Sequence, residues 1–156
     1  MESFMNLSEL TMVAEVELVY RNKVLPSDRP KVTRSKDAYD CFIATWNFDK
    51  IEYIEQFKVM LLNRSGRVLG IIEMSSGGVS GTVVDLKVIF AAALKGNACS
   101  IILAHNHPSG DLTPSQQDIE MTRRVKRAGE ILDISVNDHL IITAVGYYCF
   151  ADQGLM

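Results

Sequence analysis

The stretch CSIILAHNHPSGDLTPSQQD, residues 99–118, decides the fold that this sequence predicts. It opens with an apolar run of strand length, residues 99–104, which leads directly into His105. A run without polar alternation is typical of a strand that is buried on both faces. We therefore expect a central strand here, with the histidine at its end.

A helix is expected to follow the loop after this strand. Thr113 is expected to be its N-cap, Pro114 fits the first helical position, and Gln116 completes a capping box. The helix is expected to continue to about Glu130. Its inward-facing residues are predicted to be Ile119, Thr122, Val125 and Leu132.

Upstream, the pattern predicts a hairpin and then a helix. Residues 57–62 and 68–74 are expected to be the strands of the hairpin, and the glycine-rich residues 75–82 a loop. Apolar residues at helical spacing predict a helix over residues 86–94, with Gly96 at the C′ position.

Three short strands are expected at the C-terminal end, and the fold class follows from the element order. The strands are predicted at residues 134–136, 140–144 and 147–150. Because hairpins alternate with helices, we expect an α/β (α+β) fold in which helices flank a mixed β-sheet.

Residues 1–50 are expected to be an N-terminal extension and residues 51–156 the main domain. Alternation over residues 13–20 predicts a half-buried strand in the extension. Ser35 is expected to cap a helix that continues to Trp46.

The composition is that of an ordinary globular chain: 156 residues, 47% hydrophobic, 22% charged and a net charge of −3. This negative net charge argues against a function that depends mainly on electrostatic binding to nucleic acid or to an anionic membrane. A basic cluster on the predicted helix that begins at Thr113 is expected to be a solvated face: Arg123, Arg124, Lys126 and Arg127.

Location is predicted from what the sequence lacks. No apolar run approaches the roughly 20 residues that span a bilayer, and the first residues do not resemble a secretory signal. We therefore expect a cytoplasmic protein. Its three separated cysteines, Cys41, Cys99 and Cys149, are expected to be small buried residues.

Two of the three histidines lie in the tripeptide His105-Asn106-His107, at the end of the predicted buried strand. Side chains two residues apart on an extended segment point the same way, about 6–7 Å apart, so two imidazoles can converge on one zinc ion. Asp118 is favoured as a third ligand because it lies at the helix start, but Asp111 is also close. Three protein ligands leave one position open, as in catalytic zinc sites.

These residues also carry a family resemblance. His105, His107, Ser115 and Asp118 match the JAMM/MPN+ metalloprotease signature H-x-H-x7-S-x2-D, and the string HNHPSGDLTPSQQDIEMT resembles the RadC family within that superfamily. EQFKVMLLNRSGRVLG and NDHLIITAVGYY fit the RadC pattern too. The resemblance implies a JAB/MPN-like core of the cytidine deaminase-like kind, and one zinc ion on the two histidines and Asp118 rather than Asp111.

The resemblance further implies an upstream glutamate that acts as acid and base. Glu55 is preferred because Phe57 follows it at the family's spacing, and Glu52 is the alternative. The Ser115 hydroxyl is expected to donate to an oxyanion. Asp138-His139 matches a RadC pair of unclear role, in which we expect His139 to be mainly structural, and Cys149 replaces a usual serine.

The sequence therefore predicts a zinc-dependent metallohydrolase, a peptidase or isopeptidase whose substrate is a peptide or an isopeptide-linked protein. One alternative is a DNA-repair or other nucleic-acid-associated protein, although the helix-hairpin-helix segment of full-length RadC proteins has no match here. The other is a metal-stabilised interaction module without turnover, which the complete motif disfavours. HNH nucleases are discounted because their motif residues are not consecutive.

Overall fold

The computed structural model describes residues 21, 23–77 and 84–156. The five strands of these described residues form one sheet in the order β2-β1-β3-β4-β5. β3 and β4 run parallel, and every other neighbouring pair is antiparallel, so the mixed sheet with β3 at its centre is confirmed. The strands are β1 (Gln56–Leu62), β2 (Val68–Ser76), β3 (Ser100–Asn106), β4 (Ser135–Thr143) and β5 (Gly146–Cys149).

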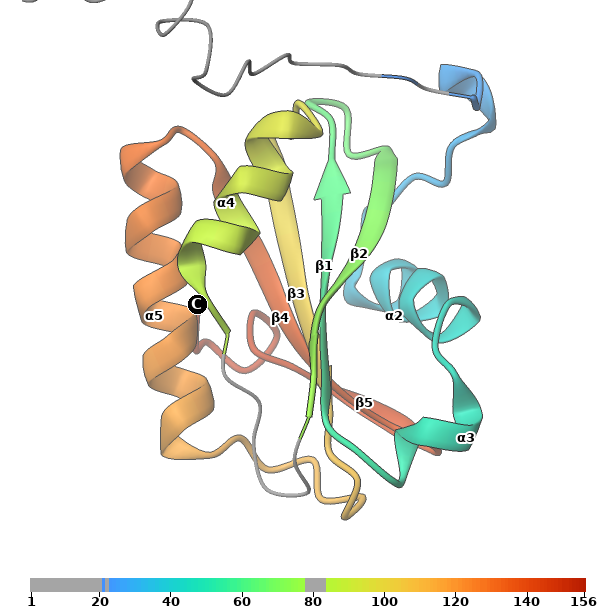
Figure 1. Ribbon diagram of the computed structural model, residues 1–156, viewed down its shortest axis with the longest axis vertical. Helices are drawn as coiled ribbons and strands as arrows, with labels where there is room; N and C mark the ends of the chain where they lie inside the picture. The colour runs from blue at the N-terminus through green and yellow to red at the C-terminus, as the bar shows by residue number, and fades with distance from the viewer. Residues whose placement is uncertain (1–20, 22, 78–83) are drawn as a thin grey trace, which may run out of the picture.

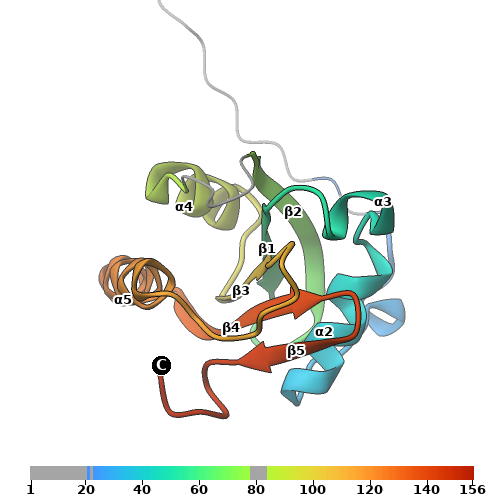
Figure 2. The ribbon, with the colours of Figure 1, turned by 90° about the horizontal axis from the view of Figure 1, so that it is seen from below.

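Helices cover both faces of this sheet (Figures 1 and 2). α4 (Leu86–Lys95) and α5 (Gln116–Ile131) lie on one face. On the other lie α2 (Ser35–Ala44) and α3 (Phe48–Ile51), preceded by the 3-10 turn η1 (Pro26–Asp28). The protein is therefore a three-layer α/β/α sandwich, consistent with the expected JAB-like fold.

Each face of the sheet has its own apolar core, because successive strand side chains point to opposite sides. In β1, Phe57, Val59 and Leu61 pack toward α4 and α5, whereas Met60 and Leu62 pack toward α2. α2 and most of α3 lie in the predicted N-terminal extension. These two helices and the chain between them contribute to the second core through Ala38, Phe42, Trp46 and Ile51.

The C-terminal strands differ from the prediction. Residues 134–136 and 140–144 were expected to be separate strands, but β4 is continuous across them. Asp138 and His139 interrupt the apolar pattern, yet both are buried and hydrogen-bonded within the fold. Polar residues that find internal partners therefore extend a strand where the sequence pattern predicts a break.

Both predicted caps of the helices α2 and α5 were wrong. Arg34, not Ser35, is the N-cap of α2. Ser115, not Thr113, is the N-cap of α5, and its capping box is closed by Asp118. The ionised carboxylate makes a stronger, charge-assisted bond at the helix N-terminus than the expected Gln116 amide would.

Several side-chain expectations also need correction. Thr122 and Val125 are buried as predicted, but Leu132 is 41% exposed. Gly96 has φ −78 and is the C-cap of α4, so it does not occupy the predicted left-handed C′ position. A Cβ there would lie 2.5 Å from Leu61 Cδ1 and 3.0 Å from the Ala92 carbonyl oxygen, so a larger residue would require the Leu61 side chain to shift. Cys149 is buried as predicted, whereas Cys41 is half-buried and Cys99 exposed.

Two expectations concern segments that are not described. The predicted strand at residues 13–20 lies outside the described residues, as do residues 78–83 of the predicted glycine-rich loop. Within the described part of the chain, no helix combines the length and apolar character needed to cross a membrane.

Candidate metal centre

The end of β3 and the start of α5 bring three side chains together: His105, His107 and Asp118. One ligand atom from each lies within 4.8 Å of the other two. His105 Nε2 is 2.9 Å from His107 Nε2 and 3.3 Å from Asp118 Oδ1, and His107 Nε2 is 3.5 Å from Asp118 Oδ2. Ligand atoms of a tetrahedral zinc site lie about 3.3 Å apart, so this donor set fits one such ion.

The sheet holds the two histidines on one side. His105 lies opposite Phe57 in the β1–β3 register and is fully buried. The His107 backbone N–H donates to the Ile142 carbonyl at 3.1 Å, so pairing with β4 continues one residue beyond β3. The backbone therefore remains extended through the tripeptide, and the alternation of side chains is kept.

The protonation of His107 follows from its contact with Asp111. His107 Nδ1 lies 2.6 Å from the Asp111 carbonyl oxygen, which can only accept. The proton therefore sits on Nδ1, and the lone pair of the neutral ring is on Nε2, facing the centre. Asp111 takes part through its backbone, because its carboxylate accepts instead from the Thr113 N–H at 2.8 Å.

Ser115 holds the carboxylate of Asp118. The Ser115 N–H and hydroxyl each donate to Asp118 Oδ2 at 2.7 Å, and the Asp118 N–H donates to Ser115 Oγ at 3.1 Å. Burial opposes ionisation, but the adjacent imidazoles of His105 and His107 and the hydrogen bond from Ser115 outweigh it and hold the pKa of Asp118 well below its usual range. The one hydroxyl proton of Ser115 is committed to this carboxylate, so the oxyanion role stays a prediction.

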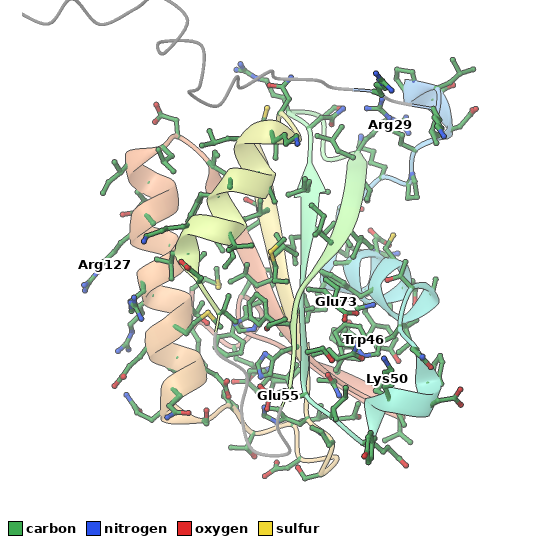
Figure 3. The ribbon with its side chains drawn as sticks, viewed as in Figure 1. Arg29, Trp46, Lys50, Glu55, Glu73 and Arg127 are labelled. Atoms are coloured by element: carbon green, nitrogen blue, oxygen red, sulfur yellow. The ribbon has the colours of Figure 1, made fainter. Side chains whose placement is uncertain are left out.

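Glu55 lies immediately before β1 at the same end of the sheet (Figure 3). The hydrogen bond with Asp118 raises the pKa of His107 against the effect of burial, and the Asp111 carbonyl and the charge of Glu55 raise it further. The Glu55 carboxylate is therefore within electrostatic reach of the centre. Glu52, the alternative, is exposed at the C-cap of α3.

Comparison with known proteins identifies the family. The model of the RadC-like JAB domain matches residues 32–155. The chain belongs to the RadC family. It is 42% identical over 147 residues to a UPF0758 protein of Flavobacterium johnsoniae, 42% over 152 residues to one of Porphyromonas gingivalis, and 35% over 149 residues to one of Clostridium beijerinckii. These matches cover 94–96% of this chain but only 63–64% of each relative, so the chain spans less than two thirds of their length.

In this RadC domain, Asn106 anchors the segment that carries Glu55. Its Oδ1 accepts from the Gln56 N–H at 2.7 Å, and its Nδ2 donates to the carbonyls of Ile51 and Ile54 at 2.7 and 2.9 Å. Glu55 thus stands between two anchored peptide groups. Asn106 was not among the predicted site residues. The sequence did contain one indication of its role: Asn106 is polar, yet the alternation of side chains along the strand places it on a face that packs into an apolar core.

His139 is fully buried behind His105. Its Nε2 lies 2.8 Å from His105 Nδ1, and its Nδ1 lies 2.6 Å from Thr122 Oγ1. Burial holds the pKa of His139 well below its ordinary value, and a positive charge on His105 would lower it further, so the ring is neutral. The RadC-type histidine of unclear role therefore contacts a predicted metal ligand directly.

Asp138 ties the strand that carries His139 to the chain around β5. Cys149 Sγ donates to Asp138 Oδ2 at 2.8 Å, and the backbone N–H groups of His139 and Ala151 donate to Asp138 Oδ1. Burial and the bond with Asp138 raise the pKa of Cys149 to about 12, so the thiol keeps its proton and serves as a donor. Cys149 thus makes the kind of bond to Asp138 that a serine hydroxyl could make.

Proposed function

We propose that this RadC domain is a zinc-dependent metallohydrolase that cleaves an amide bond in a peptide or an isopeptide-linked protein. The convergence of His105, His107 and Asp118 supports this proposal best. Two imidazole nitrogens and one carboxylate form the donor set of catalytic zinc sites that keep one position open. Bound there, zinc would supply a Lewis acid that polarises a carbonyl and acidifies water.

Glu55 is the group proposed to move protons. It takes a proton from the attacking water and delivers it to the leaving amine nitrogen as the carbon–nitrogen bond breaks, which yields a carboxyl group and an amine. Two features support this role: the charge of Glu55 acts on His107, and Asn106 fixes the backbone on both sides of it. Ser115 and the α5 N-terminus keep Asp118 ionised and oriented.

A nucleic-acid-associated function would use a different surface. Arg123, Arg124 and Arg127 are exposed on α5, and Arg127 points away from the sheet (Figure 3). These side chains do not belong to the cluster of ligand atoms. The amide-bond chemistry is therefore the function that the metal centre itself favours.

The test is cleavage by the zinc-loaded chain of a library of peptides and isopeptide-linked conjugates, read by mass spectrometry. Glu55→Gln should retain about one zinc per chain and lose cleavage by about 10²–10⁴-fold. Glu52→Gln, which alters the exposed glutamate, is the matched control and should cleave normally. The proposal fails if zinc does not bind, if no amide is cleaved, or if Glu55→Gln cleaves as well as the wild type.

A further inference from the structure

We propose that Thr122 and His139 are positioning residues that fix the tautomer and orientation of His105. The three side chains form a continuous hydrogen-bonded relay that begins and ends at proposed metal ligands. The inference rests on the metal site proposed above but not on the reaction.

The relay runs from the backbone of Asp118 to the ring of His105. Thr122 Oγ1 donates to the Asp118 carbonyl at 2.6 Å, one turn earlier in α5. The same oxygen lies 2.6 Å from His139 Nδ1, and His139 Nε2 lies 2.8 Å from His105 Nδ1. The far side of the His105 ring then faces Asp118, with Nε2 at 3.3 Å from Oδ1. The relay thus links the backbone of one ligand to the ring of another.

Counting protons along the relay assigns each of its hydrogens. The Asp118 carbonyl has no proton, so the single Thr122 hydroxyl proton points to it. His139 Nδ1 must therefore donate to Thr122, which leaves the Nε2 of the neutral His139 ring as an acceptor. His105 Nδ1 then donates to His139, and the lone pair of His105 is on Nε2, toward the centre.

The relay is also shielded and rigid. Thr122 is 1% exposed, and His105 and His139 are both 0% exposed. His139 stacks on Phe150 with ring centroids 4.6 Å apart, and Phe57 packs against both rings of the relay. Water therefore does not compete for the hydrogen bonds. Metal-ligating histidines generally need such a partner on the second nitrogen, and here a neutral imidazole takes the place of the usual carboxylate or carbonyl.

The first experiment reads the tautomers of the metal-free full chain by proton–nitrogen NMR. The wild type should show His105 protonated on Nδ1 with Nε2 bare. Thr122→Val removes the acceptor for His139, so His105 should shift toward a mixture that includes the Nε2–H form. A role in packing alone would leave the tautomer of His105 unchanged. A wild-type spectrum with His105 protonated mainly on Nε2 overturns the inference.

The second experiment measures zinc affinity by competition with a chelator. Thr122→Val and His139→Leu should each bind zinc about 10–100-fold more weakly. His139→Gln should restore part of the affinity, because its amide oxygen can accept where Nε2 did. Thr45→Val is the matched control: its hydroxyl donates to the Phe42 carbonyl at 2.9 Å from the end of α2, on the other face of the sheet.

The outcomes separate this inference from the proposed function. If Thr122→Val is folded and binds zinc within about two-fold of the wild type, the relay does not position His105. Should His139→Leu fail to fold, Thr122→Val decides alone. Should wild-type zinc binding itself be absent, the proposed function fails, while the tautomer of the metal-free protein still decides the relay.

Discussion

Replacing Asn106 with alanine should destabilise the protein severely, because three backbone groups lose their partner at once. The Gln56 N–H and the carbonyls of Ile51 and Ile54 all bond to this amide. Gln56 and Ile51 are each 2% exposed, so water cannot replace the lost bonds there. A buried unsatisfied group costs about 1–3 kcal/mol, and Ile54 is half-buried, so the total should be about 3–6 kcal/mol.

The assay is urea unfolding of the metal-free chain followed by circular dichroism. Asn106→Asp separates donor from acceptor, because it keeps an oxygen for the Gln56 N–H but cannot donate to the two carbonyls. It should therefore cost at least as much as Asn106→Ala, despite its similar size. Asn137→Ala is the control, since its amide donates to Ser100 Oγ at an exposed position, and should change stability by less than about 0.5 kcal/mol.

Hydrogen exchange of the backbone amides provides a second measurement of the effect of replacing Asn106. The Gln56 amide should exchange much faster in the Asn106 variants, because its N–H loses its partner next to Glu55. A loss of less than about 1 kcal/mol in Asn106→Ala, or a Gln56 backbone amide that stays protected in this variant, would show that Asn106 is not the anchor of this segment.

Three further predictions concern other parts of the fold. Ser115→Ala removes the N-cap of α5 and a hydrogen-bond donor to the Asp118 carboxylate. The free energy of unfolding should therefore fall by about 1 kcal/mol, and zinc binding should weaken in a calorimetric titration. Unchanged zinc affinity would contradict this prediction. Gly129→Ala should lower the Tm although alanine favours helices, because its Cβ would lie 2.3 Å from a backbone carbonyl; a higher Tm would show that the contact relaxes. Alkylation of the native chain at about pH 8 should modify the exposed Cys99 and spare the buried Cys149, whose pKa is raised to about 12. The labelled sites can be identified by mass spectrometry. Rapid labelling of Cys149 would argue against its buried hydrogen bond to Asp138.

The elements predicted best are those whose pattern is local and apolar. The hairpin of β1 and β2, the central strand β3 and the helix α4 were all expected close to their observed bounds. Each shows an apolar run or a helical spacing that needs no distant partner to be interpreted. β4 was divided in the prediction because Asp138 and His139 look like surface residues, and only their partners from α5, β3 and the chain around β5 make them core residues.

The start of α5 shows a different limit of local reasoning. Two capping boxes overlap in the sequence, one from Thr113 to Gln116 and one from Ser115 to Asp118. The first also has a proline in the favoured position, yet the second forms. Instead, the Thr113 N–H donates to the Asp111 carboxylate in the preceding turn. Propensity alone does not rank the two boxes. The Asp118 carboxylate favours the second box, because it accepts from the Ser115 N–H while the two histidines stabilise its negative charge.

The candidate ligands could be found from their spacing, but the residues that support them could not. Their contacts join residues far apart in the chain, from Asn106 to Ile51 and from His139 to His105. Nothing in the sequence brings those pairs together until the sheet order is known.

The central strand explains how one tripeptide serves both halves of the proposed site. Because side chains alternate along β3, His105 and His107 face α5, while Asn106 faces the opposite side, where the chain enters β1. The histidines thus meet Asp118 on one face, and the asparagine holds the backbone around Glu55 on the other. A strand fixes these directions relative to one another, so the proposed ligands and the proposed proton carrier are positioned by the same three consecutive residues. A shift of one residue in the pairing of β3 would exchange the two faces and abolish both arrangements together.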